Sequence, residues 1–231
     1  IAGFGLSRLS LYLTGKTSAN QKETLTLNLD RFDLSVINSL IGTELGISGA
    51  ATGNIQLTSP LQNFGLLADM ICDSTHIAGI PLGVLQASSS WNDKFNRFDI
   101  DFRNGLEGSN NIIANGKLYP KNKRLEATAD LNHLNIGYVQ PFLKDIFSVM
   151  DGTVSGRIMM EGPLDNIDIS STDTRIDNAE LKIAYTNVPY YAQGTFHLDN
   201  RGAYFDDVYL KDRHDGTGKM TGSIYWDHFR N

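Results

Sequence analysis

One pattern occurs twice in this chain, at positions 103 residues apart. The stretch GAATGNIQLTSPLQN spans residues 49–63, and GTVSGRIMMEGPLDN spans residues 152–166. Identical residues hold matching places in the two stretches: Gly49 and Gly152, Gly53 and Gly156, Pro60 and Pro163. Such a repeat marks a structural unit that the chain builds more than once, so it limits the possible folds strongly.

The regions around the motif also correspond. Upstream, LDRFDL (29–34) aligns with LNHLNI (131–136), and downstream GKLY (116–119) aligns with GSIY (222–225). The offset changes only between strand-like runs, where insertions are tolerated. We therefore predict one continuous array of two degenerate repeats, the first over residues 1–119 and the second over residues 120–231.

Apolar and polar residues alternate strictly in several short runs, which is the period of a strand with one apolar face. Turn residues such as Asn104-Gly105, Asp151-Gly152 and Asp215-Gly216 separate the runs. The sequence thus predicts an all-β, repetitive antiparallel sheet. The alternating apolar residues are the candidate lining of its apolar side: Leu25, Leu27, Leu29, Phe98, Ile100, Phe102, Leu181, Ile183, Phe196 and Leu198.

Two apolar segments, one in each repeat, favour short helices that cap the sheet. DLSVINSLI allows two turns, with Asp33 as the cap and with Val36, Ile37, Leu40 and Ile41 on the apolar side. In the second repeat the helix is predicted to begin at Pro141, with Phe142, Ile146 and Phe147 apolar. Each helix is either a small lid on a core or a flap over an open apolar channel.

The repeated motif has a structural explanation. Two glycines at a spacing of four leave the strand thin, so that another chain segment can pass close to it. Proline lacks an amide hydrogen and ends the pairing of the strand. We therefore assign Gly49, Gly53, Pro60, Gly152, Gly156 and Pro163 structural rather than catalytic roles.

A repeated strand array can form a closed sandwich, a barrel or an open solenoid, and composition does not separate these. In a sandwich, the apolar faces are buried against a second sheet. In an open curled sheet, they line a trough that needs a guest, because large exposed apolar patches usually mark binding surfaces.

The doubled GxxxGxI…PLxN motif and the alternating strands around it resemble the TamB/AsmA-like family of Gram-negative envelope proteins. The resemblance covers roughly residues 24–225. The family pattern often has Gly after the Pro segment, where this chain has Asn63 and Asn166.

The resemblance implies a sheet folded over into an open β-groove (a β-taco) with a continuous apolar interior. It also implies a periplasmic location, an inner-membrane anchor elsewhere in a longer chain, and a role in outer-membrane biogenesis. Because the sequence begins and ends in strand-like patterns, we expect it to be a segment excised from such a chain.

The resemblance implies two possible guests. One is a phospholipid whose acyl chains pass between the inner and outer membranes. The other is an outer-membrane protein that the segment helps to assemble, with an outer-membrane barrel partner of the TamA type. A third possibility, independent of the family, is a closed β-sandwich or solenoid that binds protein or glycan through its surface.

Other classes of function are not indicated. The net charge is −6 and basic residues are scattered, which argues against a nucleic-acid partner. Cys72 is the only cysteine and is expected to be a small buried apolar residue. The five histidines are spread out and no catalytic motif is present, so we expect no enzyme, no metal site and no cofactor. KDRHDGTGK (211–219) is predicted to be a solvated hairpin turn.

Overall fold

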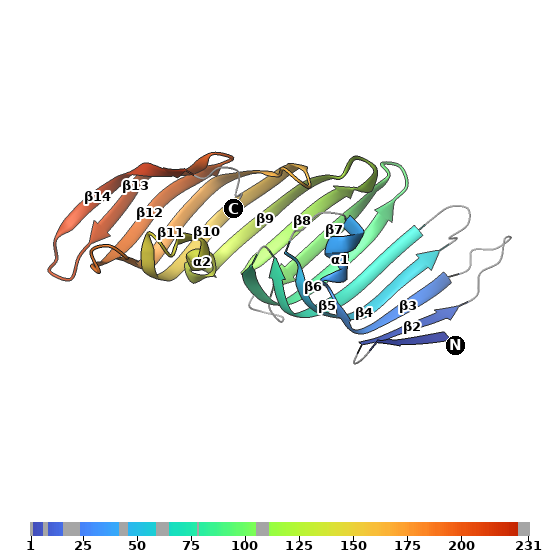
Figure 1. Ribbon diagram of the computed structural model, residues 1–231. Coiled ribbons are helices and arrows are strands. Elements are labelled where there is room, and N and C mark those ends of the chain that lie inside the picture. The colour runs from blue at the N-terminus through green and yellow to red at the C-terminus, as the bar shows by residue number, and fades with distance from the viewer. Residues whose placement is uncertain are drawn as a thin grey trace. The chain divides into compact units, whose positions relative to one another are not determined.

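The computed structural model describes residues 2–6, 9–15, 24–41, 46–58, 65–77, 79–104 and 111–225. Their strands form an open antiparallel sheet, in which strand order equals sequence order from β1 to β14 (Figure 1). The strands are β1 (Ala2–Leu6), β2 (Leu9–Gly15), β3 (Thr24–Asp33), β4 (Ser48–Thr58), β5 (Gly65–Ile77), β6 (Ile80–Asn92), β7 (Arg97–Asn104), β8 (Ile112–Tyr119), β9 (Arg124–Asn135), β10 (Phe147–Pro163), β11 (Asp168–Ile183), β12 (Pro189–Asp199), β13 (Gly202–Lys211) and β14 (Thr217–Tyr225). The all-β, antiparallel prediction is confirmed.

Helices are few and short within the described residues. They are α1 (Val36–Ile41), α2 (Gln140–Leu143) and the 3-10 turns η1 (Pro120–Asn122) and η2 (Ile136–Val139). The predicted helical caps therefore exist, but the second was wrong in its extent. Phe147 opens β10 and packs into a core, and Ile146 is 39% exposed. Val36, predicted to face inward, is also exposed.

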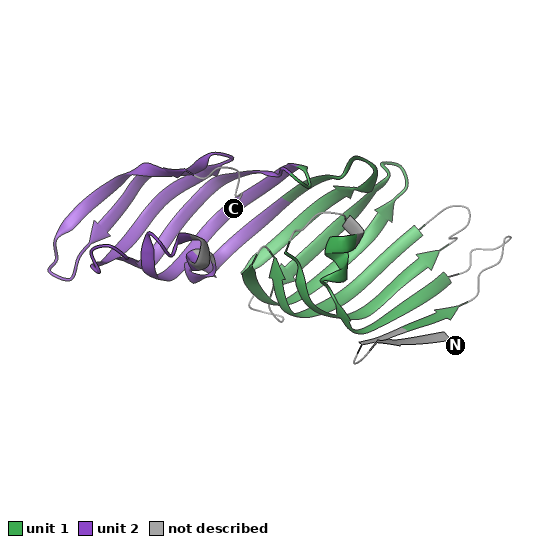
Figure 2. Ribbon diagram, viewed as in Figure 1, with its two compact units in different colours: residues 1–127, 163–165 green, residues 128–162, 166–231 purple. Residues whose placement is uncertain are grey.

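By their contacts, the residues divide into two compact units (Figure 2). Unit 1 comprises residues 1–127 and 163–165, and unit 2 comprises residues 128–162 and 166–231. The predicted repeat boundary between residues 119 and 120 lies close to this division but differs from it, since the start of β9 belongs to unit 1.

The repeat is visible in the order of the elements. Strands β3 to β8 correspond one for one to β9 to β14, and the short helices follow the first strand in both sets. Asp33 Oδ1 accepts a hydrogen bond from the Ser35 N–H at 2.8 Å, and Asn135 Oδ1 accepts one from the Gly137 N–H at 2.6 Å. The next residues, Leu34 and Ile136, are both buried.

An unusual backbone conformation near the end of the first strand recurs in each set. Arg31 has a φ of 54° and His133 a φ of 50°, values that non-glycine residues seldom adopt. The Arg31 N–H donates to Thr52 Oγ1 at 3.2 Å, and the His133 N–H donates to Ser155 Oγ at 3.1 Å. The two copies therefore share backbone detail that their side chains do not reveal.

The glycines of the motif lie where another strand leaves no room for a side chain. A Cβ on Gly53 would meet the Asp69 carbonyl oxygen, and a Cβ on Gly156 would lie 2.6 Å from the Thr174 Cα. Gly49 and Gly152 also have positive φ, at 130° and 114°. This confirms the expectation of close approach at the motif. β10 ends at Pro163, as predicted, and Pro60 lies outside the described residues.

Each unit has its own apolar core. In unit 1 the buried members are Leu29, Leu34, Ala51, Cys72 and Leu85. In unit 2 they are Ile136, Ile176, Ala179, Leu181, Ala192 and Val208. Leu34 and Ile136 come from the segments that follow β3 and β9, so these segments lie on the apolar face of the sheet.

No second sheet packs on this face among the described residues of either unit, which contradicts the closed-sandwich alternative.

Candidate functional site

The candidate site is the apolar face of each unit, which we call the inner face. In unit 1, cross-strand pairing joins apolar and small residues from β3 to β8 in continuous rows. One row runs Leu27, Ile55, Ala68, Ser89, Ile100, Gly116. The next row runs Leu29, Gly53, Met70, Ala87, Phe102, Ala114. Six of the ten predicted lining residues therefore belong to one surface: Leu25, Leu27, Leu29, Phe98, Ile100 and Phe102.

Exposure differs between members of these rows. Leu29 is 6% exposed because the core under α1 encloses it. Leu25, Leu27, Ile100 and Phe102 are only half-buried. Phe98 contacts Trp91 edge to face, with ring centroids 4.9 Å apart. The inner face of unit 1 thus combines buried members, such as Leu29 and Ala68, with partly exposed ones, such as Ile100.

Unit 2 has the same arrangement. One row runs Val154, Ile176, Gly194, Val208, Met220, and the next runs Thr174, Phe196, Phe205, Gly222. Phe196 stacks on Phe205 with centroids 6.0 Å apart, and Leu198 lies opposite Ala203. Leu181 is 6% exposed within the core, and Ile183 pairs with Phe147 at the end of β11.

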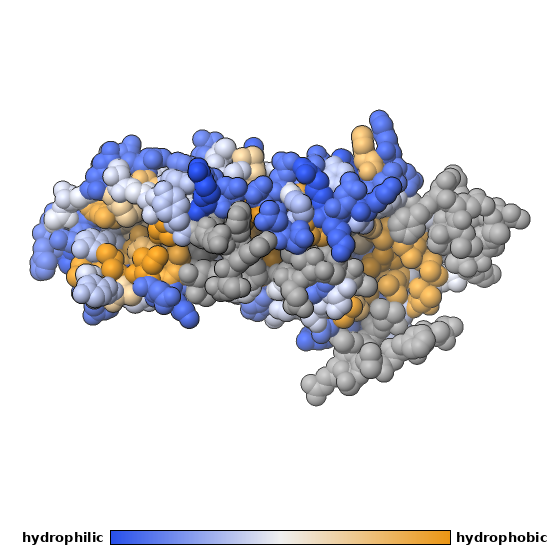
Figure 3. All heavy atoms as spheres, turned by 45° about the horizontal axis from the view of Figure 1, so that its top comes forward, coloured by the Kyte–Doolittle hydropathy of each residue, from blue (hydrophilic) through white to orange (hydrophobic). Residues whose placement is uncertain are grey.

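Apolar and polar residues are also separated on the molecular surface. In Figure 3, hydrophobic residues gather over the strands of each unit, and hydrophilic residues border them. The polar residues on the outward side of the strands pair with one another. Arg157 binds Asp130 with both Nε and Nη2, at 2.6 and 3.2 Å, and Arg97 Nε binds Asp99 at 2.7 Å.

The short segment at α1 is anchored at several points. The Leu34 N–H donates to the Gly49 carbonyl at 2.9 Å. The Asn38 side chain donates to the Ile47 carbonyl at 2.8 Å and accepts from the Ile47 N–H at 3.1 Å. Hydrogen bonds from the side chain and the backbone N–H of Ser35 lower the pKa of Asp33. Ile37 packs on the core below.

Cys72 belongs to the core of unit 1 and is 4% exposed, as the sequence indicated. Burial, with a smaller contribution from the Asp73 carboxylate, raises the pKa of its thiol. The thiol therefore remains protonated at neutral pH, so Cys72 acts as an apolar side chain rather than as a nucleophile.

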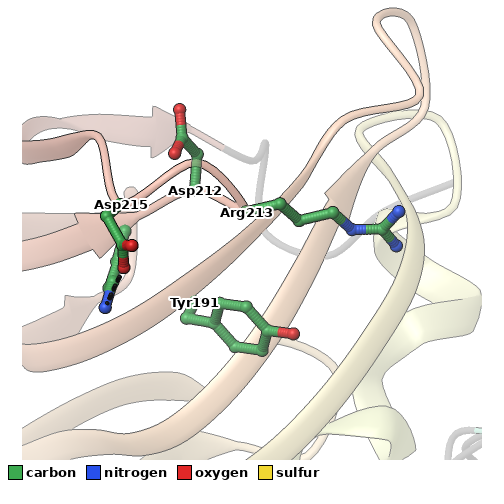
Figure 4. Close-up of a pocket in the computed structure, with 5 residues that line it drawn as sticks. Tyr191, Asp212, Arg213 and Asp215 are labelled. Carbon is green, nitrogen blue, oxygen red and sulfur yellow. Dashed lines mark ion pairs between the residues drawn. The ribbon is translucent and has the colours of Figure 1, made fainter.

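A hollow of about 630 Å³ lies at the hairpin between β13 and β14 (Figure 4). Its lining residues are Tyr191, Lys211, Asp212, Arg213 and Asp215. Lys211 pairs with Asp215 at 2.6 Å, and Asp212 Oδ1 accepts from the N–H groups of His214 and Gly216, both at 2.8 Å. The stretch is a charged, exposed turn, as predicted.

No family model, no curated protein and no solved structure matches this chain. Within the described part of the chain, no three His, Cys, Asp or Glu side chains form a group that could hold a metal ion. No helix among the same residues is long and apolar enough to cross a membrane.

Sequence reasoning missed the small and polar members of the rows. Ala68 and Gly116 carry too little apolar surface to mark a strand face, and Ser89 is polar. Ile55 could have been predicted, because it alternates with Leu57 inside the repeated motif. The pairing partners of the predicted residues could be found only from the register of the strands.

Proposed function

We propose that this chain is a hydrophobic β-groove segment of a TamB/AsmA-like envelope protein, and that it holds phospholipid acyl chains on their way between the inner and outer membranes. The role is non-enzymatic, in outer-membrane biogenesis, with the segment in the periplasm and a membrane anchor elsewhere in a longer protein. The supporting observation is the half-exposed inner face, whose rows cross six strands in unit 1 without a charged side chain.

The dimensions of the face suit such a guest. Adjacent strands lie about 4.8 Å apart, so five spacings from β3 to β8 give roughly 24 Å. The hydrocarbon half-thickness of a bilayer is about 15 Å. An acyl chain lying along a row would therefore be covered over its length, with its headgroup in water at the rim.

The energetics need no specific polar contact. Each buried methylene group contributes about 0.8 kcal/mol, so eight of them contribute roughly 6 kcal/mol before the cost of ordering the chain. Because this attraction is non-directional, a guest can slide along the face. Ser89, the one hydroxyl in the first row, does not interrupt the apolar path, since Ala68 and Ile100 flank it.

A fluorescent fatty acid titrated into the protein tests the proposal. Ile100→Asp places a carboxylate in the middle of a row and should weaken probe binding at least about tenfold. Ile113→Asp is the matched control, because Ile113 lies on the outward side of the neighbouring strand and is 48% exposed. Circular dichroism of both variants checks that the sheet is retained. Equal binding by both variants would contradict the acyl-chain site.

The assembly-factor alternative predicts a different contact. A client barrel strand would pair with the backbone of an edge strand rather than lie on the inner face. Photo-crosslinking from an inner-face position to lipid, but not to an unfolded outer-membrane protein, supports lipid carriage. The reverse pattern would favour the assembly role.

A further inference from the structure

The outward side of β12–β14 carries a group of tyrosines that the inner face does not explain. Tyr191 and Tyr209, near the hairpin between β13 and β14, are 48% and 58% exposed, and Tyr225, at the opposite end of β14, is 69% exposed. Within the described residues, their hydroxyls form no hydrogen bond with the protein. Tyr209 lies opposite Gln193, which is two residues from Tyr191 along β12, so the Tyr191 and Tyr209 side chains are diagonal neighbours at roughly 7–8 Å.

The second aromatic group lies at the other end of the same strands. The His197 ring stacks on the Tyr204 ring, with centroids 4.7 Å apart and an interplanar angle of 8°. Tyr204 and Tyr225 contact each other edge to face, with ring centroids 5.9 Å apart. His197 is six residues from Tyr191 along β12, which corresponds to roughly 20 Å. Thr195 lies between the two groups and is exposed.

We propose that this outward side of β12–β14, which we call the tyrosine face, binds a neutral polysaccharide strand. The polarised C–H groups of a sugar ring are attracted to the electron-rich face of an aromatic ring. Tyrosine supplies such a ring at little conformational cost, and a β-sheet holds it in place before the ligand arrives. Gln193, Thr195 and the free tyrosine hydroxyls provide hydrogen-bond partners for sugar hydroxyls.

Charge on the tyrosine face favours an uncharged ligand. Lys211 pairs with Asp215, Lys219 pairs with Asp207, and His197 Nδ1 lies 3.1 Å from Asp206. Because both lysine charges are matched locally, the face offers no extended positive field to attract a nucleic acid or an anionic membrane.

Comparison of the two repeats shows that the exposure of Tyr225 is not required by the fold. Tyr119 occupies the place of Tyr225 in the first repeat. Its hydroxyl accepts from Arg97 at 3.3 Å and donates to Glu126 at 3.4 Å, and the Arg97 guanidinium lies 6.0 Å from its ring centroid. In the first repeat, Arg97 and Glu126 bind the hydroxyl of Tyr119, whereas its counterpart in the second repeat, Tyr225, is exposed.

Isothermal titration calorimetry with cellohexaose and chitohexaose tests the proposal. The wild-type chain should bind at least one of these neutral oligosaccharides saturably. The double variant Tyr191→Ala, Tyr209→Ala should weaken that binding about tenfold or more, whereas Tyr191→Phe, Tyr209→Phe should retain most of it. Tyr185→Ala is the matched control, since Tyr185 is 97% exposed in the turn after β11.

Three outcomes would overturn the proposal: no saturable binding of either oligosaccharide, equal weakening by Tyr185→Ala, or full binding by a correctly folded double alanine variant. Binding of the tyrosine face to neutral phosphatidylcholine vesicles in place of the oligosaccharides would assign it to a lipid surface instead. The test does not depend on the inner face, so it is separate from the proposed acyl-chain role.

Discussion

Replacing Gly156 with alanine should destabilise unit 2 substantially. Gly156 has a φ of 139°, which L-residues rarely adopt, and its new Cβ would lie 2.6 Å from the Thr174 Cα and 2.8 Å from the Asp173 carbonyl oxygen. Thr174 is 1% exposed, so it has no free space in which to move.

The magnitude follows from two contributions. The backbone strain costs about 1–3 kcal/mol. The overpacking costs about another 1–3 kcal/mol. Together they reach about 2–6 kcal/mol, a large part of the 5–15 kcal/mol that separates folded from unfolded states in typical domains. With a urea dependence of about 3 kcal/mol per M, the unfolding midpoint should fall by about 0.7–2 M.

Urea unfolding followed by circular dichroism measures this shift. Gly218→Ala is the matched control: Gly218 lies in β14, and a Cβ there would meet nothing within 4 Å. Its midpoint should remain within experimental error of the wild type or rise slightly. If Gly156→Ala unfolds at the same urea concentration as Gly218→Ala, the explanation given for the repeated glycines is wrong.

Further predictions concern the segments and cores on the inner face. Asp33→Ala and Asn135→Ala should each cost about 0.5–2 kcal/mol of unfolding free energy, since each removes an equivalent turn hydrogen bond. The pKa of Asp33 is lowered on folding, so its contribution to stability is present above about pH 4 and should disappear as the pH falls further. Acid titration of the wild type and of Asp33→Ala measures this loss. The pKa of Cys72 is raised on folding, so the stability of the wild type should decline above about pH 8.5 more than that of Cys72→Ala. N-ethylmaleimide should also react far more slowly with the folded chain than with the urea-unfolded chain. Val208→Ala should cost about 2 kcal/mol because Val208 is fully buried, whereas Val149→Ala, at a position 39% exposed, should change stability by less than about 0.5 kcal/mol in the same thermal scan.

The strands could be predicted from the sequence because period-two alternation and glycine-rich turns are local signals. Leu25, Leu27 and Leu29 illustrate this, since all three lie on the predicted face. The bulge at Arg31 could not be predicted. Its positive φ depends on a hydrogen bond to Thr52 on the next strand, and it shifts the register so that Phe32 pairs with Ala51.

The second helix was predicted too long for a related reason. Phe142, Ile146 and Phe147 have helical spacing. In the structure, however, Phe147 pairs with Ile183 and packs into the core of unit 2, which stabilises the strand conformation. Tertiary contacts thus overrode a local preference.

The solvent exposure of the inner face was the least predictable property of the candidate site. Leu29 and Ile100 look alike in the sequence, yet the core beneath α1 encloses Leu29 and leaves Ile100 half-exposed. Whether an alternating strand faces a second sheet, a short helix or solvent depends on segments distant in sequence.

Paramagnetic broadening of isoleucine methyl signals by a spin-labelled fatty acid tests the acyl-chain proposal most directly. Ile55 and Ile100 lie on the inner face of unit 1, and Ile71 and Ile113 lie on the outward side of the same sheet, 47% and 48% exposed. The proposal predicts that the methyl signals of Ile55 and Ile100 broaden while those of Ile71 and Ile113 stay sharp. Equal broadening on both sides, or none at a saturating concentration of the probe, would contradict it.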